Sequence, residues 1–157
     1  MAITGVSHIA IGVSDMEQAL GFYRGVLGLE VFVDHIEDVA VQDIPPYQRH
    51  AVYLTWPGGK QNKSFLVLDS QDGAGPASPR SLGDRGVHHF AFTVDDLETI
   101  HGRAVAAGCP ILVDPMDMAA DDPLNPTDST VRTTFFSDPD GNVIQLDQYL
   151  RAADQQS

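Results

Sequence analysis

His8-Ile-Ala-Ile-Gly-Val-Ser-Asp-Met-Glu17 returns 81 residues later as His89-Phe-Ala-Phe-Thr-Val-Asp-Asp-Leu-Glu98, with five of the ten positions identical. In both copies a histidine opens an alternating apolar segment that leads into a helix start. The repeat therefore indicates a duplicated unit, in which His8 and His89 occupy equivalent places. Two equivalent histidines are a candidate metal site.

The composition limits the class of protein. The chain has 157 residues, of which 43% are hydrophobic and 20% charged, as in a globular domain. Its net charge of -13 would repel a phosphate backbone, so we expect no nucleic-acid partner. No apolar run approaches the roughly 20 residues of a membrane span, and no secretory signal is evident, so we expect a cytoplasmic protein.

Hydrophobic alternation and capping residues predict the same order of elements in both halves. In the first half, a helix should run from the Ser14-x-x-Glu17 capping box to about Val26, and strands should cover residues 6–13, 29–36, 50–56 and 63–69. In the second half, a helix should run from Asp95 to Ala107, and strands should cover residues 87–94, 111–113, 131–137 and 142–149. Each half is therefore a βαβββ module, spanning about 1–69 and 87–150.

Two segments are predicted to be connections. Residues 70–86 are rich in Gly, Ser, Asp and Pro and form the expected linker between the modules. Residues 114–128 carry five aspartates and three prolines, which predicts a solvated loop, with a lid over a site as the other interpretation.

The duplicated order, the strand histidines and the turn Asp138-Pro-Asp-Gly-Asn142 together resemble the vicinal oxygen chelate superfamily. This superfamily includes glyoxalases, extradiol dioxygenases, methylmalonyl-CoA epimerases and bleomycin-resistance proteins. The resemblance covers about Ile3 to Leu150. It implies an α+β fold in which paired βαβββ modules, here one domain over residues 1–157, form an open, cup-shaped mixed sheet around a metal.

The resemblance also implies a set of metal ligands. The first-strand ligands fall on His8 and His89, and the last-strand ligand, commonly glutamate in the family, falls on Gln145. The fourth-strand ligand falls on Val67, which cannot bind a metal and would only line the substrate site. The loss of that ligand favours a three-ligand site, as in the dioxygenases. An amide at Gln145 can ligate a hard ion but cannot act as a base.

Strand alternation places other polar side chains on the faces that carry these ligands. Asp69 lies two residues after Val67, and Asp147 lies two residues after Gln145, so either carboxylate could shuttle a proton. Tyr149, on the same face as Asp147, either donates a hydrogen bond to a substrate oxygen or caps the end of the strand.

Further cations and histidines have several interpretations. Arg132 either meets an anionic substrate or is solvated. His88 should point to the face opposite His89. The remaining histidines have no matched partners and are interpreted as surface or packing residues, namely His35, His50 and His101.

Two classes of function follow. The first is a divalent-metal-dependent enzyme acting on a small oxygenated substrate, with Fe²⁺ preferred and Mn²⁺, Zn²⁺ or Ni²⁺ as alternatives. Its chemistry is extradiol-dioxygenase-like on a catecholic substrate, or that of a glyoxalase-like isomerase, epimerase or lyase. The second is a metal-free protein that binds a drug or metabolite, for which Val67 and Gln145 are the remains of a metal site. Open sheet edges favour a homodimer in either case.

Overall fold

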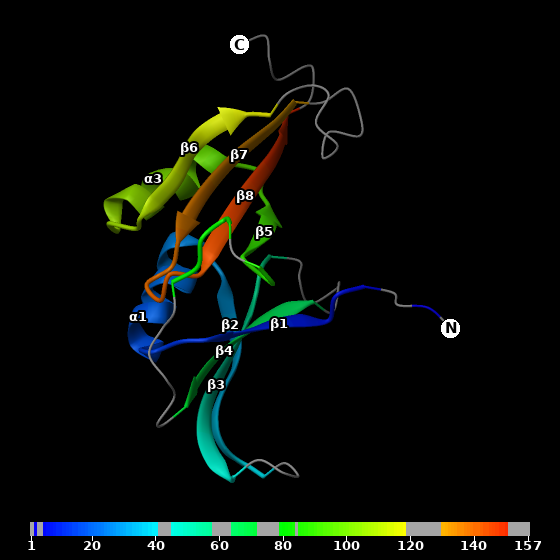
Figure 1. The fold of residues 1–157 in the computed structure, drawn as a ribbon, viewed down its shortest axis with the longest axis vertical. Helices are drawn as coiled ribbons and strands as arrows, with labels where there is room; N and C mark the ends of the chain where they lie inside the picture. The colour runs from blue at the N-terminus through cyan, green and yellow to red at the C-terminus, as the bar shows by residue number, and fades with distance from the viewer. Residues whose placement is uncertain are drawn as a thin grey trace. The chain divides into compact units, whose positions relative to one another are not determined.

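The structure is a computed structural model that describes residues 2, 5–40, 45–57, 64–71, 79–83, 85–118 and 130–150. The chain divides into two compact units, Met1–Ala77 and Ser78–Ser157. Each unit carries a four-stranded mixed sheet with helix against it (Figure 1). The predicted α+β fold with two βαβββ modules is confirmed.

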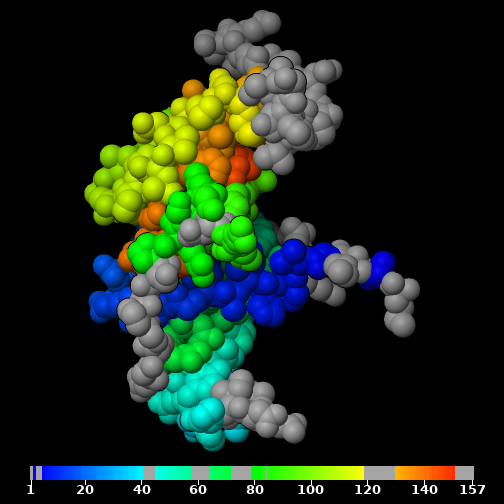
Figure 2. All heavy atoms as spheres, in the orientation of Figure 1, coloured from blue at the N-terminus to red at the C-terminus, as the bar shows by residue number. Residues whose placement is uncertain are grey.

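The first unit follows the predicted order of elements. These are β1 (His8–Gly12), helix α1 (Met16–Leu20) with its π-helical continuation η1 (Gly21–Val26), β2 (Glu30–Val39), β3 (Tyr47–Thr55) and β4 (Phe65–Gln71). The strand order is β1-β4-β3-β2, in which β1 runs parallel to β4 and the other neighbours are antiparallel. The cyan atoms of β3 lie in continuous contact with the green atoms of β4 (Figure 2).

The second unit repeats this topology. Its elements are β5 (His89–Thr93), α3 (Leu97–Ala106), β6 (Ile111–Asp117), β7 (Thr130–Ser137) and β8 (Val143–Leu150). The strand order is β5-β8-β7-β6, again with one parallel pair, β5 and β8. Within the described residues, no helix is long and apolar enough to span a bilayer.

Strand ends differ from the sequence prediction in both units. β2 and β3 pair out to Val39 and Tyr47, beyond the predicted strands 29–36 and 50–56. β6 continues to Asp117, so the first four residues of the predicted loop 114–128 are strand, while residues 119–129 lie outside the described part. Pairing with a neighbouring strand, and not side-chain alternation alone, sets these ends.

Both helices begin one residue later than predicted. The Asp15 carboxylate accepts from the Gln18 N–H at 2.9 Å, and the Asp96 carboxylate accepts from the Thr99 N–H at 3.0 Å. The predicted caps, Ser14 and the first aspartate of the second helix, were therefore wrong by one position. In the first helix, the dipole favours the charged Asp15 over the neutral Ser14, whereas in the second helix both candidates are aspartates and this argument does not separate them.

One face of each sheet packs against its helix and forms the core. In the first unit the helix contributes Ala19, Phe22, Tyr23 and Val26, each at most 4% exposed. The sheet contributes Val52, Leu54, Leu66 and Leu68, each at most 1% exposed. In the second unit Thr134 bonds His101 of α3, so the side of the sheet that carries Thr134 and Leu146 meets that helix.

The opposite side of each sheet is here called the helix-free face. In the first unit its central members are His8, Ala10, Gly12, Phe65, Val67, Asp69, Arg49, Ala51, Tyr53, His35 and Glu37. In the second unit they are His89, Ala91, Thr93, Val143, Gln145, Asp147, Thr133 and Phe135. Most of the site residues predicted from the sequence therefore lie on these two faces.

Candidate functional site

Aromatic side chains extend from His8 across the helix-free face of the first sheet. The imidazole of His8 stacks on Phe65 at 5.2 Å between ring centroids, and Phe65 stacks on Tyr53 at 5.5 Å. Phe32, at the register shift of β2, meets Phe65 edge-on at 5.7 Å and stays 39% exposed. A bulge turns this side chain toward the face. These four residues, His8, Phe65, Tyr53 and Phe32, form what we call the aromatic row.

Val67 occupies the implied fourth-strand ligand position. It pairs with Ala10 on one side and Tyr53 on the other, and it is 5% exposed. An isopropyl group has no lone pair, so this position contributes packing and no ligand.

A charged cluster lies on the same face, centred on Arg49. The guanidinium donates to Glu37 at 2.6 Å and to Asp69 at 2.7 Å, so it joins β2, β3 and β4. His35 extends the cluster, with Nε2 3.5 Å from the Glu37 carboxylate. Sequence reasoning missed Arg49 and Glu37, because their proximity depends on the register of three strands. Alternation on β3, which puts Arg49 on the face of Tyr53, was the available signal.

The cluster leaves one carboxylate oxygen of Asp69 without a bond. Hydrogen bonding from Arg49 lowers the pKa of Glu37. Hydrogen bonds to Glu37 and Asp69 in turn raise the pKa of Arg49. Asp69 Oδ2 is held by Arg49, whereas Asp69 Oδ1 is buried and has no hydrogen-bond partner among the described residues. Asp69 Oδ1 is therefore an acceptor on the helix-free face that the fold itself does not use.

In the second unit, His89 is bonded to the residue before it. His89 Nδ1 lies 2.7 Å from His88 Nδ1. The predicted opposite orientation of His88 was wrong, because β5 starts at His89 and His88 is not in the strand. Burial, followed by the charge of His88, lowers the pKa of His89, and Asp147 opposes this. Burial thus favours the neutral form of His89, which is the form that binds metals.

Gln145 and Asp147 form a buried polar group on β8. Gln145 Nε2 donates to Asp147 Oδ1 at 2.8 Å, and Thr133 Oγ1 donates to the same oxygen at 2.8 Å. Gln145 is 5% and Asp147 9% exposed. The amide nitrogen is committed to Asp147, so Gln145 Oε1 is the atom that can accept or ligate.

The other two predicted site residues differ in position. Tyr149 continues the row of Gln145 and Asp147 along β8 and is 44% exposed. Arg132 pairs with Gln148, on the side of the sheet that meets α3. It is ion-paired to Glu98 at 3.1 Å and to Asp117 at 3.2 Å. We therefore leave Arg132 out of the site.

The three predicted metal ligands share one feature. Each has a polar atom held by a neighbour: His8 Nδ1 lies 3.3 Å from Ser7 Oγ, and the corresponding contacts of His89 and Gln145 are those to His88 and Asp147. His89 and Gln145 belong to neighbouring strands of one face, whereas His8 belongs to the first unit. In the described part of the chain, no three or more His, Cys, Asp or Glu side chains gather as a metal site.

Known proteins share this fold. A glyoxalase family protein from Bacillus cereus has a TM-score of 0.78 at 14% identity, over 96% of this chain and 97% of its own. An antibiotic-binding protein from Streptomyces has a TM-score of 0.61 at 27% identity, over 95% of this chain and 98% of its own.

Sequence relatives agree with the structural ones. An ethylmalonyl-CoA/methylmalonyl-CoA epimerase from Cereibacter sphaeroides is 30% identical over 107 residues, which are 68% of this chain and 73% of the epimerase. The family model for the glyoxalase/bleomycin resistance protein/dioxygenase superfamily matches residues 5–146. With two βαβββ units that each begin with a strand histidine, this chain belongs to the glyoxalase/bleomycin resistance protein/dioxygenase superfamily.

Proposed function

We propose that this protein is a divalent-metal-dependent enzyme that moves a proton on a small oxygenated substrate. His8, His89 and Gln145 would hold the ion through His8 Nε2, His89 Nε2 and Gln145 Oε1. The observation that carries the proposal is that the other polar atom of each donor already has a partner. Such outer partners fix the tautomer and orientation of metal ligands, so each of these three side chains is held in a form that can ligate a divalent ion.

Asp69 is the proposed proton acceptor. The bound ion would supply Lewis-acid stabilisation of the substrate oxygens. Arg49 holds one oxygen of Asp69, which leaves Oδ1 to take a proton from carbon. Asp147 has a different role, because its Oδ1 already accepts from Gln145 and Thr133. It orients the amide of Gln145 and supplies the negative charge that this ligand lacks.

The activity named for one relative supports proton transfer. Epimerisation, the activity named for the 30% identical relative, removes a proton from carbon and returns it. Gln145 cannot be the base in this chain, so the proton must go to another group. Asp69 is a carboxylate on the helix-free face, and its Oδ1 has no hydrogen-bond partner among the described residues. This supports Asp69 as the proton acceptor.

Hydrogen exchange tests this function without knowledge of the natural substrate. The metal-loaded protein is incubated in D₂O with a panel of 2-oxo acids, 2-hydroxyketones and acyl thioesters, and loss of the carbon-bound proton is followed by NMR. We expect exchange in the loaded wild type, none after chelation, and at least roughly a hundredfold slower exchange in Asp69→Asn. Asp38→Asn, on the opposite side of the same sheet, is the control. Exchange that survives in Asp69→Asn would remove this residue from the role.

A metal-free binding protein is the second candidate. The aromatic row offers stacking surface, Val67 adds apolar contact, and the 27% identical Streptomyces protein is described as antibiotic-binding. Tryptophan fluorescence of the chelated protein, titrated with bleomycin and other aromatic antibiotics, tests this function. Tight binding that is unchanged by chelation and lost in Phe65→Ala would favour this candidate over the enzyme.

A further inference from the structure

The arginine beside the proposed proton acceptor is shared unequally between two carboxylates. Arg49 donates from Nε and from Nη2 to one oxygen of Glu37, at 2.6 Å in both cases. It donates only from Nη1 to Asp69, at 2.7 Å. Glu37 lies directly across from Arg49 in the pairing of β2 with β3, whereas Asp69 lies on β4 and diagonal to it. Glu37 therefore holds one edge of the guanidinium and leaves Asp69 a single donor.

This division determines how many hydrogen bonds Asp69 accepts. An arginine and a carboxylate often form two parallel N–H···O bonds, which occupy both carboxylate oxygens. At Asp69 only Oδ2 is bonded to Arg49, and Oδ1 is buried without a hydrogen-bond partner among the described residues. Because Nη2 of Arg49 is bonded to Glu37, it is not available to cover Oδ1 of Asp69. A neighbouring carboxylate thus keeps open the oxygen that the proposed function requires.

Glu37 also offsets the charge of Arg49. A cation beside a carboxylate favours the ionised carboxylate and so makes it a weaker base. Hydrogen bonding to Glu37 is the largest cause of the raised pKa of Arg49, and the bond to Asp69 contributes less. Glu37 therefore offsets part of the positive charge, and Arg49 weakens Asp69 as a base less than it would in a pair with Asp69 alone.

The other titratable groups on this face can be identified from the strand register. Those at or next to the cross-strand row of Asp69 are Arg49 and Tyr53 on β3 and His35 and Glu37 on β2. His8 of β1 and Glu30 of β2 lie further along the sheet. Because Nε2 of His35 lies 3.5 Å from Glu37, this histidine extends the cluster on the side away from Asp69.

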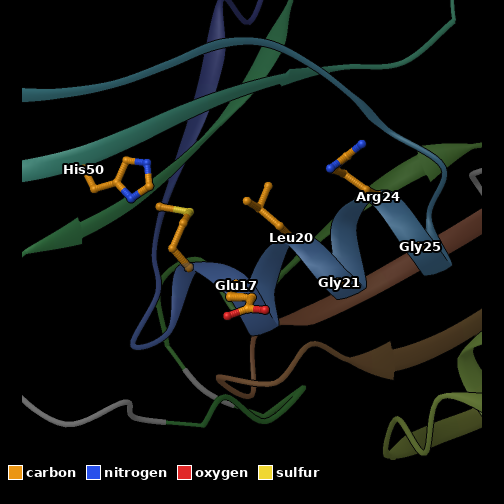
Figure 3. A pocket seen from close by; sticks show the side chains of 7 residues that line it. Glu17, Leu20, Gly21, Arg24, Gly25 and His50 are labelled. Carbon is orange, nitrogen blue, oxygen red and sulfur yellow. The ribbon is translucent and has the colours of Figure 1, made fainter.

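A second group of charges lies on the other side of the same sheet. Asp34 and His50 pair with residues of the helix side and bond each other at 2.6 Å. His50 lines a hollow of about 720 Å³ beside the helix α1–η1, and Glu17 and Arg24 line the same hollow (Figure 3). These four residues are therefore separated from Asp69 by the sheet.

We infer that Glu37 is a positioning residue for Asp69, the proposed proton acceptor. It holds one edge of Arg49 and shares its charge, which keeps Oδ1 of Asp69 open and basic. This inference rests on the proposed function, because it explains how Asp69 acts as a base. Glu37 itself has no contact with the substrate in this role.

Removal of the Glu37 charge tests the role. Hydrogen exchange by the metal-loaded protein, on the same substrate panel, is followed from about pH 5 to about pH 9 in wild type and variants. In Glu37→Gln we expect exchange to slow about three- to tenfold at neutral pH, because Arg49 then favours ionised Asp69. The acid limb of the rate profile should move about one pH unit lower for the same reason.

Two further variants separate charge from structure. Glu37→Asp retains the negative charge and should keep the acid limb close to that of the wild type. Asp38→Asn removes the same charge from the next residue, on the opposite side of the sheet, and should leave the whole profile unchanged. Circular dichroism of each variant confirms folding.

A titration without substrate distinguishes this inference from the proposed function. The carboxyl carbons of the metal-free protein are labelled with ¹³C and followed by NMR, and Asp69→Asn identifies the Asp69 signal. In Glu37→Gln this signal should change over a lower pH range than in the wild type. An unchanged titration or an unchanged exchange profile in Glu37→Gln would overturn the inference. Exchange that survives in Asp69→Asn would overturn the proposed role of Asp69, while the titration would still report whether Glu37 acts on Asp69.

Discussion

At the scale of single residues, Gln145 determines where the negative charge lies beside the proposed metal ligands. An amide stands where the superfamily resemblance implies glutamate, and a carboxylate, Asp147, lies 2.8 Å from the amide nitrogen. The negative charge has in effect moved from the ligand position to its neighbour. The sequence predicted both residues on one face, but the bond between them depends on rotamers and on Thr133 of β7.

Replacing Gln145 by glutamate tests this arrangement. The variant Gln145→Glu should bind a divalent ion roughly tenfold more tightly, because affinity rises with the number of charged ligands. Without metal it should lose about 1–3 kcal/mol of unfolding free energy, since the donor to Asp147 is lost and two carboxylates meet. Calorimetric metal titration and urea unfolding in chelator measure the two effects. Gln145→Met, which removes the donor without adding charge, separates them.

His89 should make the apo protein sensitive to acid. Its pKa is lowered from the ordinary value of 6.5 in the folded state, first by burial and then by His88. As pH falls below that value the unfolded chain takes up a proton before the folded one does, so stability falls. Thermal unfolding from about pH 8 to about pH 5 should show a larger loss for the wild type than for His89→Gln. An equal loss would contradict a partly buried His89 whose neutral form is favoured in the folded state.

At the scale of elements, the turn between β7 and β8 explains why its sequence pattern was so informative. Asp138, 2% exposed, accepts from the N–H groups of Asp140 and Asn142 and from the Asn142 side chain. Gly141 has a φ of +82°, and its backbone accepts from Arg80 at 2.9 Å. The motif predicts a turn from its own residues, but the contact with Arg80 depends on tertiary structure.

Gly141→Ala should therefore be costly. The new methyl group would lie 2.6 Å from Pro79, and the left-handed backbone disfavours a side chain. We expect a loss of about 2–4 kcal/mol in unfolding free energy, measured in denaturant. Gly102→Ala, inside α3 with open space around it, is the control and should be neutral or stabilising. Equal effects of the two changes would contradict this account of the turn.

Strand pairing limited what the sequence could predict at this scale. The order of elements and the two faces follow from alternation, which each segment carries in itself. The Arg49 cluster requires β2, β3 and β4 in one register, and the bulge that turns Phe32 inward is equally a property of the pair. A local sequence pattern does not identify the strand that pairs with it, so the Arg49 cluster and the orientation of Phe32 could be seen only in the folded structure.

At the scale of the whole molecule, duplication supplies two equivalent histidines in two similar units. Divergence after duplication then distributes the remaining chemistry unequally. The first unit has the aromatic row and Asp69, and the second has Gln145 with Asp147. The central claim of the proposed function is that the protein binds a divalent ion and that both His8 and His89 are required for this binding.

Metal content measured by elemental analysis tests that claim most directly. Wild type, His8→Ala, His89→Ala and the control His101→Ala are each reconstituted with divalent ions and dialysed extensively. The account predicts one ion per chain in the wild type and in His101→Ala, and none in the other two variants. A wild type that holds no metal after reconstitution, or an ion that persists in His8→Ala or His89→Ala, would contradict it.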